Sequence, residues 1–516
     1  MTSEEAPLLN PKPKLASHSS SSSDSAVYDA AVATAAYDAE HADTVTGTLP
    51  ALAKLGTVEA FGILISIVIG SGIFTSPGAI DANVPSPAAA LGIWLAGGLL
   101  AWMGAGTMAE LGTAIGGEGG IQPYLQYIYG DIVGFLAAWT WLLAVMPATL
   151  AILSIVFIDT LLSASAAGAN ASWAVRKTLS IAVLCVFSLA NCISTRATTT
   201  LNAFFVATKF ATIIAVVLAG IAVLVCATPG FGGDDWRARS WLAPRALPLA
   251  DGGWIDWTRL SAWEALGHYS AALYAALWAY SGWDKVVYVS AEMGEPARQL
   301  PAAINMALPT IIACFMAANA AYYVLLPWAE ISATDSIAVT AVARLAGPVV
   351  GLLISVMIGL VIAGSLLGNS FVAGRMGVSA ANKNWMPRPL SHLSRLSLPF
   401  SAPSAAPGDV PVVSIGMATA LATVYILLGD FRALVTFNGL GEFTFFFLTV
   451  SGAVILRVRE PALARPYKPP IVVPLGFTMV SGFVVVRGAT FAPAQAAVLG
   501  GLWVVGVVYY VYRQQA

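Results

Sequence analysis

Two short glycine-containing stretches, each inside a long apolar segment, carry the residues best suited to bind a ligand. The first runs from Ile69 to Ile73 (IGSGI) and the second from Tyr280 to Trp283 (YSGW), about 210 residues further on. Glycine lets backbone groups approach a partner closely and weakens a helix, so both stretches are predicted to interrupt a helix. Unpaired backbone groups are costly in hydrocarbon, so an interrupted helix survives there only where it lines a cavity or holds a ligand. Each break is therefore a candidate half of a binding site.

The first break would present backbone amides at the start of a half-helix. Gly70 and Gly72 remove side chains from the interruption, and Pro77 limits how the following helix continues. Unwinding here leaves the amides of Ser71, Gly72 and Ile73 at a helix N-terminus. Such amides, with the helix dipole behind them, favour a negatively charged group such as a carboxylate.

The second break would present backbone carbonyls at the end of a half-helix. The carbonyls of Trp278, Tyr280 and Ser281 precede Gly282, and the negative end of a helix dipole favours a cation such as an ammonium group. A carboxylate at one break and an ammonium group at the other describe an α-amino acid. Close helix packing is the alternative explanation of the glycines. We favour a binding site because the breaks occupy corresponding halves of the chain.

The surrounding sequence must place these breaks inside a membrane. Hydrophobic residues are 58% of the chain, charged residues are 10% and the mean hydropathy is +0.77. A soluble domain carries about 25% charged residues, so this chain has too little polar surface to be a water-exposed globule. About twelve apolar stretches of about twenty residues run from Val58–Ile80 to Pro493–Tyr512. We predict an all-α membrane protein whose transmembrane domain spans residues 55–516.

The distribution of basic residues predicts the orientation in the membrane. An even number of spans puts both termini on one side, and the loops on that side contain Lys54, Arg196, Arg298, Lys383, Arg388, Arg395, Arg457, Arg459, Arg465 and Lys468. The positive-inside rule therefore places both termini in the cytosol. On the opposite face, the long loop 228–261 contains Trp236, Trp241, Trp254 and Trp257. For these we favour interfacial anchoring over a folded lid.

Residues 1–54 differ in kind from the rest of the chain. They contain the serine run Ser19–Ser23, scattered acidic residues and no apolar periodicity, which predicts a disordered cytosolic tail. The tail contains no basic segment followed by an apolar core, so we do not expect a cleaved signal peptide. Glu4, Leu8 and Leu9 match an acidic dileucine signal, through which sorting adaptors would direct the protein to a lysosomal or vacuolar membrane. A chance match is the alternative.

Several classes of function lack support in the sequence. A net charge of −2 and a pI near 6.1 provide no basic field for nucleic acid. The four cysteines lie in or beside apolar runs, so we expect neither a disulfide framework nor a metal site. No nucleophile–base pair, cofactor fingerprint or phosphate-binding loop indicates a catalytic site, a bound cofactor or ATP-driven pumping.

Four segments together resemble a known family. They are residues 69–77 (IGSGIFTSP), 109–113 (AELGT), 279–283 (AYSGW) and 456–467 (LRVREPALARPY). On these residues the chain, from about residue 55 to its C-terminus, resembles the L-type amino acid transporter group of the amino acid–polyamine–organocation superfamily. The similarity is greatest to fungal neutral amino acid and methionine permease-like members.

The resemblance implies twelve transmembrane helices in a five-plus-five inverted repeat, with discontinuous first and sixth helices and alternating access around the breaks. It implies that Val68, Ser71 and Gly72 meet the substrate backbone. It also makes Trp278 an aromatic gate and Ser281 an acceptor for the ammonium group. The predicted substrate site combines both breaks and their neighbours: Val68, Gly70, Ser71, Gly72, Trp278, Tyr280, Ser281, Gly282 and Asp284.

A few ionisable residues stand inside predicted spans. Lys209, alone in the fifth span, matches a family position at which an ammonium group replaces a structural sodium ion near the first break. A buried lysine is costly, so a fixed structural cation and a proton-linked group both remain open, with snorkelling to an interface as the alternative. We expect Glu110 and Glu442 to be structural or gate-associated, and His268 to be an interfacial histidine.

Three positions depart from the family pattern. The segment Ser163–Arg176 contains no cysteine, so we do not expect a disulfide-linked heavy subunit. Asp284 stands where an amide is usual, and would carry a proton, attract a cationic side chain, or pair with Lys285 or with another helix. Trp278 is larger than the phenylalanine common at the gate, which would shrink the pocket or alter its closure.

The sequence therefore predicts a secondary transporter of neutral, large or sulfur-containing L-amino acids, and not an enzyme. Exchange, proton symport and uniport remain open as coupling modes, as do the plasma membrane and the vacuolar or lysosomal membrane. Two alternatives remain. One is a carrier of cationic amino acids that uses Asp284, and the other is a membrane amino acid sensor, or transceptor, that signals through the tail with Ser19–Ser23.

Overall fold

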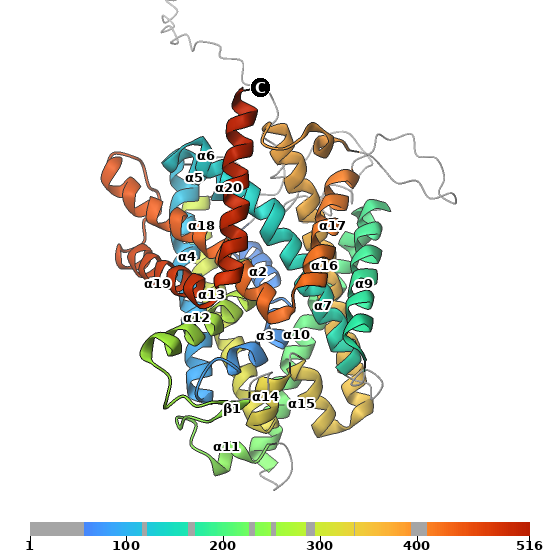
Figure 1. Cartoon of the computed structure of the whole chain (residues 1–516). Helices are drawn as coiled ribbons and strands as arrows, with labels where there is room; N and C mark the ends of the chain where they lie inside the picture. The colour runs from blue at the N-terminus through green and yellow to red at the C-terminus, as the bar shows by residue number, and fades with distance from the viewer. Residues whose placement is uncertain are drawn as a thin grey trace, which may run out of the picture.

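The computed structural model describes residues 56–115, 121–163, 171–193, 195–226, 233–248, 254–284, 295–334, 336–393 and 410–515. Within these ranges the protein is almost entirely helical (Figure 1). The exception is an antiparallel pair of two-residue strands, β1 (Leu247–Pro248) and β2 (Trp254–Ile255). The predicted tail, with its serine run and the residues Glu4, Leu8 and Leu9, lies outside the described residues.

The helices follow the chain in two groups, separated by the loop that contains β1 and β2. The first group comprises α2 (Thr57–Val68), α3 (Gly72–Asp81), α4 (Pro87–Ile115), α5 (Ile121–Tyr129), α6 (Asp131–Thr140), η1 (Trp141–Val145), α7 (Met146–Ser163), α9 (Trp173–Ile193) and α10 (Thr195–Cys226). The loop itself contains α11 (Asp235–Ala238). The second group comprises α12 (Ala262–Ala279), α13 (Pro296–Leu325), α14 (Trp328–Ala333), α15 (Ile337–Ala346), α16 (Pro348–Asn382), η3 (Arg388–Ser391), α17 (Val412–Leu428), α18 (Phe431–Arg459), α19 (Val472–Phe491) and α20 (Pro493–Gln515).

Nine helical segments of the described residues are long and apolar enough to cross a membrane. Three further spans are needed to reach the predicted twelve. The first is divided between α2 and α3, the sixth is represented by α12 up to its break, and the ninth is α17, an apolar helix of 17 residues. The prediction of an all-α membrane protein with twelve transmembrane helices is therefore confirmed.

The spans differ in how far the protein covers them. In the third span, α6 to α7, 89% of the most apolar window is buried inside the protein, whereas in α20 only 11% is buried. The third span therefore stands at the centre of the bundle, and α20 lies at its edge. In Figure 1 the C-terminal end of α20, in dark red, stands at the top of the bundle. A peripheral helix with an apolar, exposed surface is suited to contact with lipid.

A local irregularity in the third span is explained by its sequence. The segment η1, between α6 and α7, is a π-helical turn, and Pro147 follows it. Proline has no amide to bond the carbonyl of Leu143, four residues earlier. The hydroxyl of Tyr425, on α17, donates a hydrogen bond of 2.8 Å to that carbonyl instead. A side chain from a distant span thus satisfies the group that the proline leaves open.

The loop between α10 and α12 is folded against the bundle, which corrects the expectation of interfacial anchoring for Trp241. The Trp241 ring packs edge-on against Tyr323 and Trp328, both at 5.8 Å between centroids. Its carbonyl accepts a bond of 3.1 Å from the amide of Ala88 at the start of α4. Indole rings packed on other aromatic rings are stabilised by burial and edge contacts, so this part of the loop is fixed on the bundle. The side chain of Trp254 lies outside the described residues.

Candidate functional site

The first predicted break is present between α2 and α3. The helix α2 ends at Val68, the amide of Gly70 bonds the carbonyl of Val68 at 2.8 Å, and α3 begins at Gly72. Ser71 occupies the N-cap position of α3 but its side chain makes no capping hydrogen bond. The first amides of α3 therefore lack the usual side-chain acceptor at a helix start. Val68, Ser71 and Gly72 are all buried, so these amides lie in a low-dielectric interior where an anion is held strongly.

The second break follows the end of α12 at Ala279. The amide of Tyr280 bonds the carbonyl of Ala276, and the amide of Ser281 bonds the carbonyl of Trp278, each at 3.1 Å. Gly282 then adopts φ = 104°, a left-handed conformation that strongly favours glycine. The carbonyl of Trp278, expected to face a ligand, is thus already used once in the turn and retains only its second lone pair.

The two breaks lie against each other. A Cβ atom added to Gly72 would stand 2.4 Å from the Cα atom of Ala279 and 2.9 Å from its Cβ atom. Only a residue without a side chain permits this approach. The structure thereby brings the N-terminus of α3, with its positive dipole end, next to the C-terminus of α12, with its negative end. This juxtaposition is what the predicted clamp for an α-amino acid requires.

Large aromatic side chains hold the second break in place. The Tyr280 ring packs against Phe315 at 4.8 Å and Trp94 at 6.1 Å, between α13 and α4. The Trp283 ring packs against Phe446 of α18 at 4.8 Å. Both side chains are buried away from the turn, so the break offers a ligand its backbone and the half-buried Ser281. Sequence reasoning missed these anchors, although an aromatic residue on either side of a Ser-Gly pair is the signal that could have suggested them.

The remaining predicted site residues are less closely defined. Trp278 and Asp284 are half-buried, and Gly70 is partly covered. Lys209 is only 7% exposed, although it lies in a span. Protein atoms therefore cover it, which disfavours a side chain that snorkels to a lipid interface.

An ionic cluster, the outer cluster, lies at the far end of α3 from the break. Asp81, at the end of α3, is completely buried and accepts hydrogen bonds from Arg245 in the folded loop and from Tyr323 on α13. Arg245 also donates a bond of 2.9 Å to the carbonyl of Trp328. Two residues beyond α3, the side chains of Asn83 and His268 meet at 2.9 Å, which ties the segment after α3 to α12. His268, expected to be interfacial, thus has a specific partner.

A second ionic cluster, the inner cluster, lies at the opposite end of the bundle. Glu110 of α4 accepts a bond of 2.8 Å from Nε of Arg457 on α18, and Nε of Arg465 lies 3.4 Å away. The Glu110 side chain is 2% exposed. Beside this cluster, Tyr127 donates a bond of 2.7 Å to Glu460, and this bond lowers the pKa of the Glu460 carboxyl group. The expectation that Glu110 has a structural or gate-associated role agrees with these contacts.

A bundle of membrane spans in which two broken helices meet in the interior is the architecture of secondary transporters. Residues 55–512 match the family model described as "Amino acid permease". Because that match covers most of the chain, the chain belongs to the amino acid permease family. It is an integral, multi-pass membrane protein and a transporter, not an enzyme.

Comparison with curated proteins agrees with this assignment. The chain is 28% identical over 459 residues to the human b(0,+)-type amino acid transporter 1, covering 89% of this chain and 87% of the relative. It is 26% identical over 465 residues to the mouse large neutral amino acids transporter small subunit 2, covering 89% of this chain and 80% of the relative. The similarity thus extends through the whole transmembrane domain.

Proposed function

We propose that this amino acid transporter carries neutral, large or sulfur-containing L-amino acids by alternating access around the two breaks. The observation that supports this most is the close approach of Gly72 to Ala279, since it brings buried helix-start amides that lack a side-chain cap next to a helix end. An α-amino acid carries a carboxylate and an ammonium group on the same carbon atom, so adjacent amide and carbonyl ends of two helices can bind both. The mouse relative named for large neutral amino acids supports the choice of side chain.

In this proposal the backbone does most of the binding. The amides around Ser71 and Gly72 hold the carboxylate, with Val68 against the substrate backbone and Gly70 leaving room for it. Carbonyls at Tyr280 and Ser281 hold the ammonium group, and the turn at Gly282 aims them. Trp278 closes over the substrate as an aromatic gate. Lys209 serves as a fixed cation or a proton-linked group that stabilises the broken first span.

A carrier of cationic amino acids is the second candidate, because Asp284 stands two residues beyond Gly282 and is half-buried. A carboxylate there would attract a lysine or arginine side chain. Replacement of Asp284 by Asn separates the two candidates. A cationic carrier would lose arginine uptake by about tenfold or more while leucine uptake persists, since a charge-assisted bond contributes about 1.5–3 kcal/mol. A neutral carrier would show little arginine uptake in either form.

The deciding experiment is uptake of radiolabelled leucine, methionine and arginine by the purified protein in liposomes. Vesicles are loaded with unlabelled amino acid, with buffer, or with buffer at a different pH, which separates exchange, uniport and proton symport. We expect leucine and methionine to accumulate faster than arginine. Binding of amino acids without flux under every condition would favour the sensor. The absence of both binding and flux would contradict the proposal.

The assembly and orientation are part of the same proposal. We propose that both termini are cytosolic, because the inner cluster and the described basic residues Lys383 and Arg388 lie at the end of the bundle where α20 ends. The mouse relative is named a small subunit, but Ser163–Arg176 contains no cysteine for a disulfide to a second subunit. A non-reducing gel of the native complex would test this, since a band that shifts on reduction contradicts it.

A further inference from the structure

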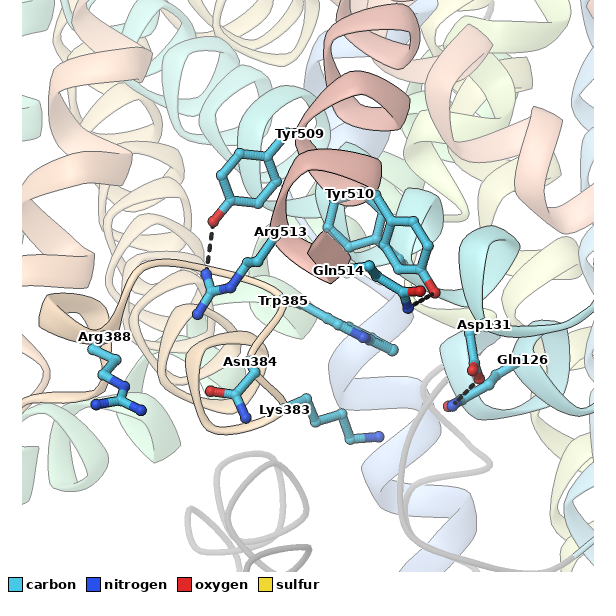
Figure 2. Close-up of a pocket in the computed structure, with 11 residues that line it drawn as sticks. Gln126, Asp131, Lys383, Asn384, Trp385, Arg388, Tyr509, Tyr510, Arg513 and Gln514 are labelled. Atoms are coloured by element: carbon cyan, nitrogen blue, oxygen red, sulfur yellow. Dashed lines mark hydrogen bonds between the residues drawn. The ribbon is translucent and has the colours of Figure 1, made fainter. Parts of the chain in front are cut away.

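A pocket of about 450 Å³ lies at the end of the bundle where α20 ends, away from the two breaks. Figure 2 shows Arg513 and Gln514 descending from α20 between the segment Lys383–Arg388 on one side and Asp131 on the other. A volume of this size is in the range of about 300–1,000 Å³ that small-ligand sites occupy. Nothing in the proposed transport cycle uses these residues.

The charge of the pocket is positive. Lys383, Arg388 and Arg513 line it, and within the described parts of the chain none of the three forms an ion pair with a carboxylate. Arg513 instead donates a bond of 2.7 Å to the hydroxyl of Tyr509, and Lys383 lies 5.3 Å from the centre of the Trp385 ring. Asp131 is the one carboxylate among the described lining residues, so three cations leave the pocket with a net positive charge, which favours an anion with more than one negative charge.

The other lining groups suit a ring that carries hydroxyls. The Asp131 carboxylate accepts a bond of 2.8 Å from Gln126 and keeps further acceptor capacity. Asn384, also in the lining, has φ = 58°, a left-handed conformation that holds Lys383 and Trp385 at a sharp turn after α16. The Asp131 carboxylate and the side-chain amides of Gln126, Asn384 and Gln514 can bind hydroxyl groups, so the lining suits a ligand that carries hydroxyls as well as phosphates. The pocket therefore combines sites for phosphate and for hydroxyl groups.

The location of the pocket indicates a lipid as the source of that ligand. One wall is α20, the span with the least buried apolar window. Tyr509 and Tyr510 stand in its last turns, and with Trp385 they form the kind of aromatic group found at headgroup depth. Basic pockets between helices on the cytosolic side are suited to anionic headgroups.

We infer that this pocket binds the phosphorylated inositol headgroup of a phosphoinositide in the cytosolic leaflet. Lys383, Arg388 and Arg513 hold the phosphates, and Asp131 and Asn384 bind ring hydroxyls. The naming of the leaflet rests on the proposed orientation of the termini; the chemistry of the ligand does not depend on which amino acid is carried. A headgroup bound in this pocket would connect the edge helix α20 to the end of α16 and to α6.

The test measures binding of short-chain phosphatidylinositol 4,5-bisphosphate to the full-length protein in detergent, with soluble inositol trisphosphate and phosphatidylserine as separate arms. We expect the phosphoinositide to bind tighter than phosphatidylserine, and Arg513→Gln to weaken it about tenfold, as loss of one charge-assisted contact does. Lys468→Gln, which removes an exposed cation from the same end of the bundle, is the matched control and should change little. Monodispersity and thermal unfolding of each variant check its fold.

Further variants and probes separate the remaining explanations. Asp131→Asn should lower the preference for the phosphoinositide over phosphatidic acid, because it removes both a hydroxyl acceptor and a repulsive charge. Equal losses in Arg513→Gln and Lys468→Gln would overturn the assignment of the site. Binding of inositol trisphosphate as tight as that of the lipid would overturn the lipid as the source. A phosphorylated peptide of residues 13–27 that binds where the lipid does not would overturn it in favour of the chain's own tail.

Discussion

At the residue scale, the proposed site depends on what Gly72 lacks. The atoms of Ala279 occupy the space where a Cβ atom of residue 72 would be, so α3 and α12 meet backbone to backbone. By contrast, a Cβ atom added to Gly62 on α2 would meet nothing within 4 Å. The two glycines lie ten residues apart on the same span but carry different constraints. They therefore form a matched pair for mutation.

We predict that Gly72→Ala lowers amino acid uptake roughly ten- to hundredfold, while Gly62→Ala leaves it nearly unchanged. Overpacking of this kind costs about 1–3 kcal/mol, and here the obstacle is backbone that cannot rotate away. Initial uptake rates in liposomes, normalised to the amount of folded protein, measure the effect. Equal uptake by the two variants would show that close contact of the breaks is not needed for transport.

Of the candidate site, the two helix breaks could be predicted from the sequence, because glycine and polar residues in an apolar segment are a local pattern. The break at Gly70 to Gly72 and the end of α12 before Gly282 are such patterns. The direction of the Tyr280 side chain was not predictable, since it depends on Trp94 and Phe315, residues remote in sequence. The same holds for the turn that uses the carbonyl of Trp278.

At the element scale, the inner cluster joins the end of α4 to the end of α18. Glu110 and Arg457 are 347 residues apart in the chain, and their side chains are 2% and 8% exposed. Arg457 also donates a bond of 2.8 Å to the carbonyl of Pro469, in the loop before α19. One carboxylate therefore holds together three segments of the bundle. Hydropathy alone finds the helices but cannot find such a partner, because each ion is an isolated charge in its own segment.

We predict that Glu110→Gln lowers stability by about 3–5 kcal/mol, because it leaves buried guanidinium groups without their carboxylate. Glu460, whose side chain is 30% exposed at the same end of the bundle, is the control, and Glu460→Gln should have a much smaller effect. Thermal unfolding of both variants in one detergent provides the measurement. If the two variants unfolded at the same temperature, the inner cluster would not be a stabilising link between α4 and α18.

At the scale of the whole molecule, the two clusters stand at opposite ends of the bundle with the breaks between them. The first broken span runs from the inner end to the outer cluster, and α12 starts at the outer loop and runs back to its break. The broken spans are thus inverted relative to each other, as alternating access by two halves requires. The number and type of the elements could be predicted from hydropathy, but the packing of the loop around Trp241 could not, because docking of a loop depends on the surface beneath it.

A deletion of residues 1–54 tests the proposed division of the chain. Every described element that contributes to the site lies after residue 55, so the shortened protein should retain its uptake rate in liposomes. Location in the cell should change if Glu4, Leu8 and Leu9 form a sorting signal, and Leu8→Ala with Leu9→Ala should reproduce that change. Loss of uptake on deletion would show that the tail is part of the transport mechanism.

The outer cluster makes a prediction about the transport cycle itself. Arg245 links Asp81 at the end of α3 to the carbonyl of Trp328, so it holds α3 against the folded loop and α14. Opening toward the outside must separate α3 from these partners if α3 moves. We therefore expect Arg245→Met to favour the outward-open form. Arg239→Met is the matched control, because Arg239 lies in the same loop but is 62% exposed in its pair with Asp235.

The reactivity of a thiol placed in the site measures the shift toward the outward-open form. Ser281→Cys, in a background with the four native cysteines replaced by alanine, is treated from outside with a membrane-impermeant thiol reagent. Arg245→Met should raise the labelling rate at least about tenfold, since a change of 1.4 kcal/mol in a two-state equilibrium is a factor of ten. A saturating amino acid should protect the thiol, which distinguishes opening of a folded site from unfolding. If Arg239→Met raised the rate as much, the contact between Arg245 and Asp81 would not be what keeps the outer side closed.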